Sequence, residues 1–155
     1  MNFACEKWFG SHEEMFANAR EVASAAPPGA GVAMLPVFAH FEYSLREHLW
    51  PGRAKPKLTK QYFGQKGVQD EIDWCVDKWL ATGRPAHARS MQLRNWQALA
   101  YCLGGRTDAA REVFAEIGPL VGDVSQWSIF GVEDAAETFV HWRQWAYGER
   151  SRGPL

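Results

Sequence analysis

Histidine and carboxylate side chains in the first third of the chain are the residues best suited to acid–base chemistry or metal binding. His12 lies near the N-terminus, and Glu47 and His48 are adjacent further along. Two histidines chelate one ion from a helix when they are three or four residues apart; no such pair and no HExxH motif is present. His40 and His48 are separated by about 12 Å along a helix, at about 1.5 Å per residue, and do not share an ion unaided.

A hairpin of two helices would bring some of these groups together. If helices over 12–26 and 33–49 run antiparallel about residue 29, the indices of facing residues sum to about 58. His12 then lies level with the segment that holds Glu47 and His48. This register predicts a polar pocket of His12, Glu47 and His48, suited to a small helical enzyme or to a metal- or ligand-binding domain. The plainer interpretation is a capped helix end with solvated polar side chains.

No sequence motif names a reaction. The chain contains no GxSxG, P-loop, GxGxxG or Cys–His signature. We therefore expect no cofactor, and binding is favoured over catalysis.

An acidic stripe is the first candidate for binding a partner. Asp70, Asp73 and Asp77 follow helical spacing and share their segment with Trp74. Such a stripe is usually a solvated helix face, but in a toxin-neutralising protein it would cover a basic active site. Trp74 lies about 140° around the helix from Trp79, at about 100° per residue, so one of the two is expected at a groove or an edge.

Residues 51–67 form the second candidate and are expected to be the longest loop. They hold five basic residues and no acidic one. The segment could dock on an acidic partner or a phosphate, be a solvated mobile loop, or pair with the acidic stripe. Tyr62 and Phe63 at its centre must either enter the core or contact a partner.

The elements that must position these residues are all predicted to be helices. Ser11 and Glu14 form a capping-box pattern, and Pro36 is tolerated only in the first turn of its helix. Strand-like alternation is absent, so the fold class is all-α, with about six helices in successive antiparallel hairpins. We expect a single domain over 1–148 and a flexible tail over 149–155. The predicted helices cover residues 12–26, 33–49, 69–82, 87–103, 108–117 and 132–147.

Composition excludes several classes of protein. Of 155 residues, 46% are hydrophobic and the formal charge is −1, which argues against disorder and against a dedicated nucleic-acid binder. Cys5, Cys75 and Cys102 lack CxxC spacing, and Cys75 and Cys102 are interpreted as reduced core thiols because they fall on apolar helix faces. Neither a secretion signal nor a membrane-spanning run is evident, so a cytoplasmic location is expected.

Two resemblances bear on the architecture. Residues 94–117 resemble one tetratricopeptide repeat in their small, aromatic and turn positions, although Arg94, Gln97 and Gly122 depart from its pattern. The N-terminal part resembles a bacterial family of domains of unknown function, which implies a helical, repeat-like fold and no chemistry. The repeat resemblance is carried by Ala98, Tyr101, Gly105, Ala110 and Phe114, and the second one by Trp8, Ser11, His12, Glu13, Met15, Phe16, Ala19, Arg20, Ala39, His40 and Glu42.

The leading functional hypothesis is a non-catalytic protein-binding module, such as an adaptor or an immunity protein that blocks a toxin. Its predicted partner is another protein rather than nucleic acid or membrane. The chain is expected to be a monomer or a homodimer, and a homodimer would use the helix that carries Trp142 and Trp145.

Overall fold

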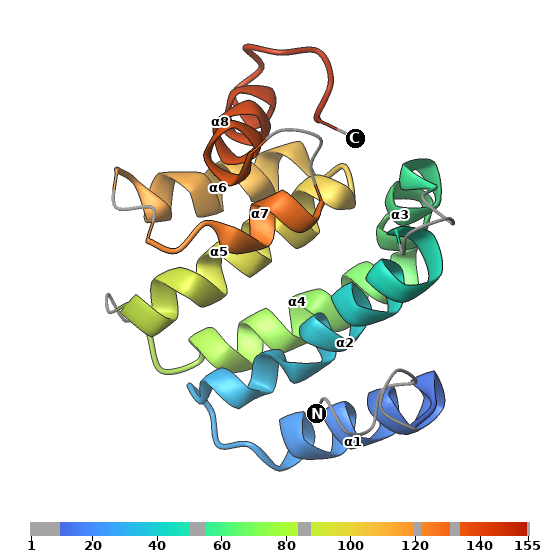
Figure 1. Ribbon diagram of the computed structural model, residues 1–155. Helices are drawn as coiled ribbons and strands as arrows, with labels where there is room; N and C mark the ends of the chain where they lie inside the picture. The colour runs from blue at the N-terminus through green and yellow to red at the C-terminus, as the bar shows by residue number, and fades with distance from the viewer. Residues whose placement is uncertain (1–9, 50–54, 84–87, 120–121, 131–133, 155) are drawn as a thin grey trace. The chain divides into compact units, whose positions relative to one another are not determined.

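The computed structural model describes residues 10–49, 55–83, 88–119, 122–130 and 134–154 (Figure 1). Within these ranges the regular elements are all helical, which confirms the all-α fold class. None of the described helices has the length and apolar character needed to cross a bilayer. In chain order the elements are α1 (His12–Ala25), the 3-10 helix η3 (Gly31–Met34), α2 (Leu35–Ser44), the π-helical turn η4 (Leu45–Leu49), α3 (Pro56–Phe63), α4 (Lys66–Leu80), α5 (Ala88–Leu103), α6 (Thr107–Ile117), α7 (Ser125–Ile129) and α8 (Ala135–Ala146).

The chain folds into two compact units. Unit 1 comprises residues 1–54 and 70–84, and unit 2 comprises residues 55–69 and 85–155. Helix α4 contributes to both, because its first turn belongs to unit 2 and the remainder to unit 1. The division of the chain into a single domain and a tail remains a prediction.

Unit 1 is built from α1, α2 and the larger part of α4. The capping box predicted at Ser11 is present, with the Glu14 backbone N–H donating to Ser11 Oγ and the Ser11 N–H donating to Glu14 Oε2. Pro36 lies in the first turn of α2, the position at which a helix tolerates proline, because its missing N–H costs no helical hydrogen bond there. Small residues on the facing sides let α1 and α2 pack closely, and the core they share includes Met15, Ala19 and Ala39, all fully buried.

The connection from α1 to η3 docks on the end of α4. Gly29 has a φ of 86°, its N–H donates to the Lys78 carbonyl at 2.9 Å, and a Cβ here would collide with the Thr82 side chain. Only glycine combines this backbone conformation with so close an approach.

Unit 2 centres on α5 and α6, which pack against each other and against α7 and α8. Gly105, with a φ of 72°, lies in the turn between α5 and α6. Three rings form the middle of the core: Trp127 stacks on Phe114 with centroids 5.8 Å apart, and Phe139 meets both edge-on. Trp127 Nε1 donates to Asn95 Oδ1 at 2.9 Å, so the buried indole N–H is satisfied.

Two short helices correct the predicted segmentation. The expectation of a long loop over 51–67 is wrong for the part that the structure describes, because Pro56–Phe63 form α3 and α4 already begins at Lys66. Pro56 starts α3, and Thr59 and Phe63, four residues apart, are its buried positions. Arg53 lies outside the described residues. The predicted loop before the last helix likewise contains α7, whose Trp127 is fully buried.

The segment after α8 turns back along that helix (Figure 1). Arg150 Nε donates to Gln144 Oε1 at 2.8 Å, and the Glu149 N–H donates to the Gln144 carbonyl at 2.8 Å. Gly153 lies so close to the Trp142 ring that an added Cβ would collide with three ring carbons. These contacts hold Glu149, Arg150 and Gly153 against α8. The flexibility of residues 149–155 as a whole stays a prediction.

Candidate functional site

The orientation of α4 decides which of its side chains are available to a partner. Ile72, Cys75, Val76 and Trp79 are buried and mark the inward face. At about 100° per residue, Asp70, Asp73, Trp74 and Asp77 fall on the opposite side of the helix. We call these four residues the α4 outer face.

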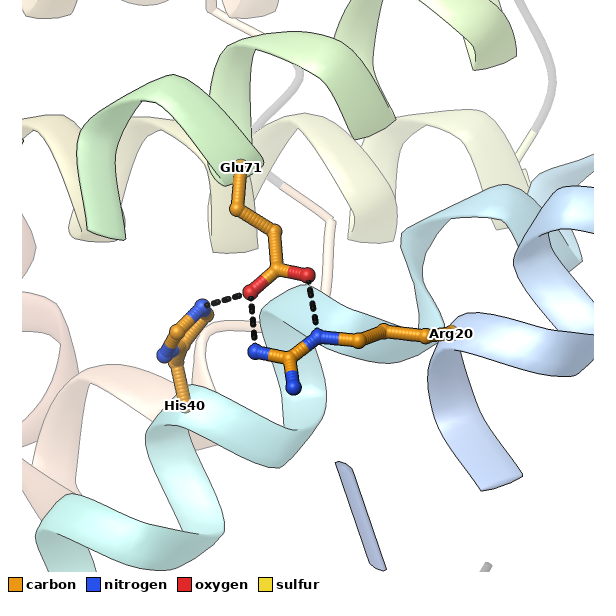
Figure 2. A network of polar contacts seen from close by, with 3 residues as sticks. All are labelled: Arg20, His40 and Glu71. Carbon is orange, nitrogen blue, oxygen red and sulfur yellow. Dashed lines mark hydrogen bonds and ion pairs between the residues drawn. The ribbon is translucent and has the colours of Figure 1, made fainter. Parts of the chain in front are cut away.

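Glu71 fixes this orientation by joining three helices of unit 1 (Figure 2). Its Oε1 accepts a hydrogen bond from Arg20 Nε of α1 at 2.7 Å, and its Oε2 accepts one from an Arg20 terminal nitrogen at 2.9 Å. The same Oε2 lies 3.0 Å from His40 Nε2 of α2. A carboxylate held by a bidentate arginine and an imidazole is restrained in direction as well as position.

The cluster has a defined electrostatic character. The hydrogen bonds from Arg20 and from His40 lower the pKa of the Glu71 carboxyl to about 2, so Glu71 is ionised at neutral pH. The His40 side chain is only 4% exposed, whereas that of Arg20 is 54% exposed and its guanidinium lies 5.0 Å from the centroid of the Phe16 ring. The cluster is thus a clamp that opens to solvent on the Arg20 side.

The nearby thiol adds no nucleophile. Burial, and to a smaller degree the negative charge of Glu71, raises the pKa of Cys75 to about 12. Burial also raises the pKa of Cys102. Because thiolates are the reactive form, neither cysteine is a nucleophile at neutral pH. Cys5 lies outside the described residues.

A second contact holds the other end of α4 against α1. Lys78 Nζ donates to the Ser24 carbonyl at 2.6 Å and lies 5.5 Å from the centroid of the Trp74 ring. Glu71 and Lys78 are seven residues apart and share one flank of α4, with Trp74 between them. The two contacts therefore position Trp74 at the edge of the α4 outer face.

Trp74 is the large apolar side chain of this face. It is 42% exposed, whereas Trp79 is 2% exposed, which confirms that the two tryptophans do not share one core direction. Asp70 and Asp77 are exposed and Asp73 is partly exposed. The structure thus brings together four of the six predicted partner-binding residues as one aromatic side chain among three carboxylates.

The remaining two predicted partner-binding residues lie elsewhere. Phe63 is fully buried in unit 2, at one of the two buried positions of α3, which matches the core alternative for this ring. Tyr62 is partly exposed and meets Phe63 edge-on with centroids 5.5 Å apart. Tyr62 acts mainly as a cover for Phe63.

The alternative pocket is only partly assembled. His12 Nε2 lies 3.1 Å from Glu47 Oε1, in the register expected for α1 against α2. His48 instead contacts Ser44, with Oγ and Nδ1 3.1 Å apart, because the π-helical turn η4 directs it to that side. Tyr43 bridges the two histidines, with ring centroids 4.9 Å from His12 and 5.9 Å from His48.

The electrostatics of this pocket favour a neutral imidazole. Burial lowers the pKa of His48, while the nearby charge of Glu47 raises it. Among the described residues, no group of three or more His, Cys, Asp or Glu side chains is arranged to hold a metal ion. A metal site at His12, Glu47 and His48 therefore has no support from the geometry of the described residues.

The tryptophan pair suggested for a homodimer is also only partly available. Trp142 is 1% exposed, and Trp145, partly exposed, meets it edge-on with centroids 5.2 Å apart. Trp142 is buried because the segment after α8 covers its ring. A homodimer that uses this helix stays a prediction.

The main positioning residue, Glu71, was missed in the sequence. Arg20 and His40 are among the residues that carry the N-terminal resemblance, but Glu71 is 51 residues from one and 31 from the other. One signal was available: a carboxylate between the buried positions of α4 is costly unless a cation meets it.

No family model, no curated protein and no solved structure matches this chain, so its function has to be argued from its own geometry.

Proposed function

We propose that the protein is a non-catalytic module that binds another protein through the α4 outer face. The single observation that supports this is Trp74, a tryptophan 42% exposed on a helix whose neighbouring outward positions are Asp70, Asp73 and Asp77. Tryptophan is strongly enriched among the residues that dominate binding energy, and surrounding charges select the partner.

The charge of the face indicates the partner's chemistry. Three carboxylates favour a surface rich in arginine and lysine, and an arginine can in addition stack on the exposed indole. A basic enzyme site that must be blocked has this character, so an immunity protein is one form of the proposal and an adaptor is the other. The clamp at Glu71 supports either, because a face held rigid loses less entropy on binding.

The tetratricopeptide-like hairpin arrangement and a cytoplasmic location are parts of the same proposal. They are supported by the packing of α5 on α6 and by the burial of Ala98, Tyr101, Ala110 and Phe114, and by the free thiols of Cys75 and Cys102.

The experiment is a pull-down from native-host lysate with tagged protein, followed by affinity measurement on the protein retained. Trp74→Ala is expected to weaken binding about 30-fold, since a tryptophan that anchors an interface contributes about 2 kcal/mol or more. Asp73→Arg with Asp77→Arg is expected to weaken binding strongly at low salt and less at high salt, because screening already reduces the attraction there.

The matched control is Glu112→Arg, which reverses an exposed carboxylate on α6, in unit 2. It should leave the affinity unchanged. A partner that binds the Trp74 and aspartate variants as tightly as the wild type contradicts the proposal.

A small helical enzyme or ligand-binding domain is the second candidate, and the His12–Glu47 contact at 3.1 Å favours it. A hydrogen-bonded imidazole and carboxylate beside a tyrosine resemble the parts of a general acid–base site. If this candidate holds, His12→Ala abolishes ligand binding while Trp74→Ala does not. The opposite pattern supports the protein-binding proposal.

A further inference from the structure

A cavity in unit 2 is independent of the α4 outer face. Its volume is about 340 Å³, and α3, the turn after α5, α8 and the segment after α8 all contribute to its wall. The residues that determine its chemistry are Lys60, Trp142, Trp145 and Arg152, together with the backbone at Gly105 and Gly153.

The charged part of the wall is basic. Lys60 comes from α3 and Arg152 from the segment after α8, and the described residues that line the cavity include no Asp or Glu. Burial lowers the pKa of the Lys60 ammonium, and the positive charge of Arg152 lowers it further. Two cations that repel each other across one cavity are both stabilised when an anion lies between them.

The aromatic part of the wall comes from Trp142 and Trp145 of α8. Trp142 and Trp145 meet edge-on at 84°, and Lys60 Nζ lies 5.5 Å from the Trp142 ring centroid. Trp142 Nε1 is buried, and the described residues offer it no hydrogen-bond acceptor. Trp145, which is partly exposed, is the indole that a flat ligand body can lie against.

The segment after α8 forms one side of the cavity through Ser151, Arg152 and Gly153. Gly153 approaches the Trp142 ring so closely that any side chain would collide with it. This contact fixes the residue next to Arg152, which is exposed, and a Cβ added at Gly105 would meet nothing within 4 Å. Arg152 thus supplies one charge, and the absence of a side chain at Gly105 leaves room for the body of a ligand.

We propose that this cavity binds a small organic anion, in which a carboxylate or phosphate group meets Lys60 and Arg152 and a flat apolar body lies against Trp145. The guanidinium fork of arginine matches both anionic groups, and the indole matches the body.

The test uses phenyl phosphate and benzoate as probes, titrated into the full chain by calorimetry and by ligand-observed NMR. At least one of them should show saturable binding to the wild type. Arg152→Gln and Lys60→Gln should each weaken it about tenfold, the loss expected when one charge-assisted hydrogen bond is removed. Neutral benzyl alcohol and inorganic phosphate should each bind more weakly than phenyl phosphate.

Arg150→Gln is the matched control, because Arg150 lies in the same segment, contacts Gln144 and does not line this cavity. It should bind the probes as the wild type does. Arg152 is exposed, so Arg152→Gln is informative even if Lys60→Gln fails to fold. Absence of saturable binding to the wild type up to about 10 mM, unchanged affinity in Arg152→Gln, or equal affinity for inorganic phosphate overturns the proposal.

Discussion

At the scale of single residues, Glu71 is the residue that positions the candidate site, although it is not one of the four residues of the α4 outer face. It joins α1 and α2 to α4 through Arg20 and His40, and thereby sets the direction in which Trp74 points. Helical periodicity can assign a residue to a face, but it says nothing about partners 31 and 51 residues away. The α4 outer face could therefore be predicted from the sequence, whereas the clamp behind it could not.

The clamp predicts a pH-dependent stability. Glu71 has a pKa of about 2 in the folded chain, below the ordinary carboxyl value of 4.5, so its stabilisation is complete above about pH 4.5 and is lost as the pH falls toward 2. At pH 7, Glu71→Gln should lower the free energy of unfolding by about 1–3 kcal/mol, the range for hydrogen bonds to charged groups. Urea denaturation at pH 7, 4, 3 and 2 should show the gap between variant and wild type closing. The exposed Glu112→Gln should show almost no gap, and a Glu71→Gln gap that is constant with pH would contradict the assignment.

At the scale of elements, segments with long apolar periodicity were predictable and short ones were not. The capping box at Ser11 starts α1, and glycines with positive φ lie after α4 and α5, at Gly83 and Gly105. In contrast, α3 has only two buried positions among eight residues and α7 spans five residues, too few turns for a periodic pattern. The basic charge of residues 51–67 therefore predicts a loop, although Pro56 and the spacing of Thr59 and Phe63 are compatible with a helix.

The reassignment of α3 leads to a prediction that separates packing from binding. Phe63 is fully buried and Tyr62 is only partly buried. Phe63→Ala should lower the free energy of unfolding by about 3–5 kcal/mol through loss of burial and the cavity left behind, and Tyr62→Ala should lower it by about 1 kcal/mol. Urea denaturation measures both. If Phe63 instead met a partner, its truncation would leave stability almost unchanged and reduce binding.

The contact between the loop before η3 and α4 can be tested by adding one methyl group at Gly29. Gly29→Ala introduces a Cβ at a φ of 86°, directly against Thr82. The free energy of unfolding should fall by at least about 1–2 kcal/mol, because the strained backbone and the collision add. Thermal unfolding of Gly29→Ala beside Gly67→Ala is a suitable comparison, since the Cβ of Gly67 would meet nothing within 4 Å. Equal melting temperatures of the two variants would show that the Gly29 contact does not form.

At the scale of the whole molecule, the notable feature is that α4 is a continuous helix with residues in both compact units. Val68 and Gln69 are buried at its unit 2 end, and Ile72 and Cys75 are buried at its unit 1 end. Helix formation is cooperative along its length, so loss of packing at one end weakens the helix at the other. We therefore expect the two units to unfold together, as one domain does, in spite of their separate cores.

Hydrogen exchange decides this directly. Ile72 is fully buried in unit 1 and Phe114 is fully buried in unit 2. Ile72→Ala should lower the global stability by about 2–4 kcal/mol, and protection of amides in α1 and in α6 should fall by the same amount. Phe114→Ala, a substitution in unit 2, should likewise lower the protection of amides in α1 as much as in α6. If Ile72→Ala reduces protection in α1 and α2 and leaves α6 and α8 as in the wild type, the units are separate domains. A substitution in one unit would then leave the binding site of the other unit unchanged, whether that site is the α4 outer face or the cavity that Lys60 and Arg152 line.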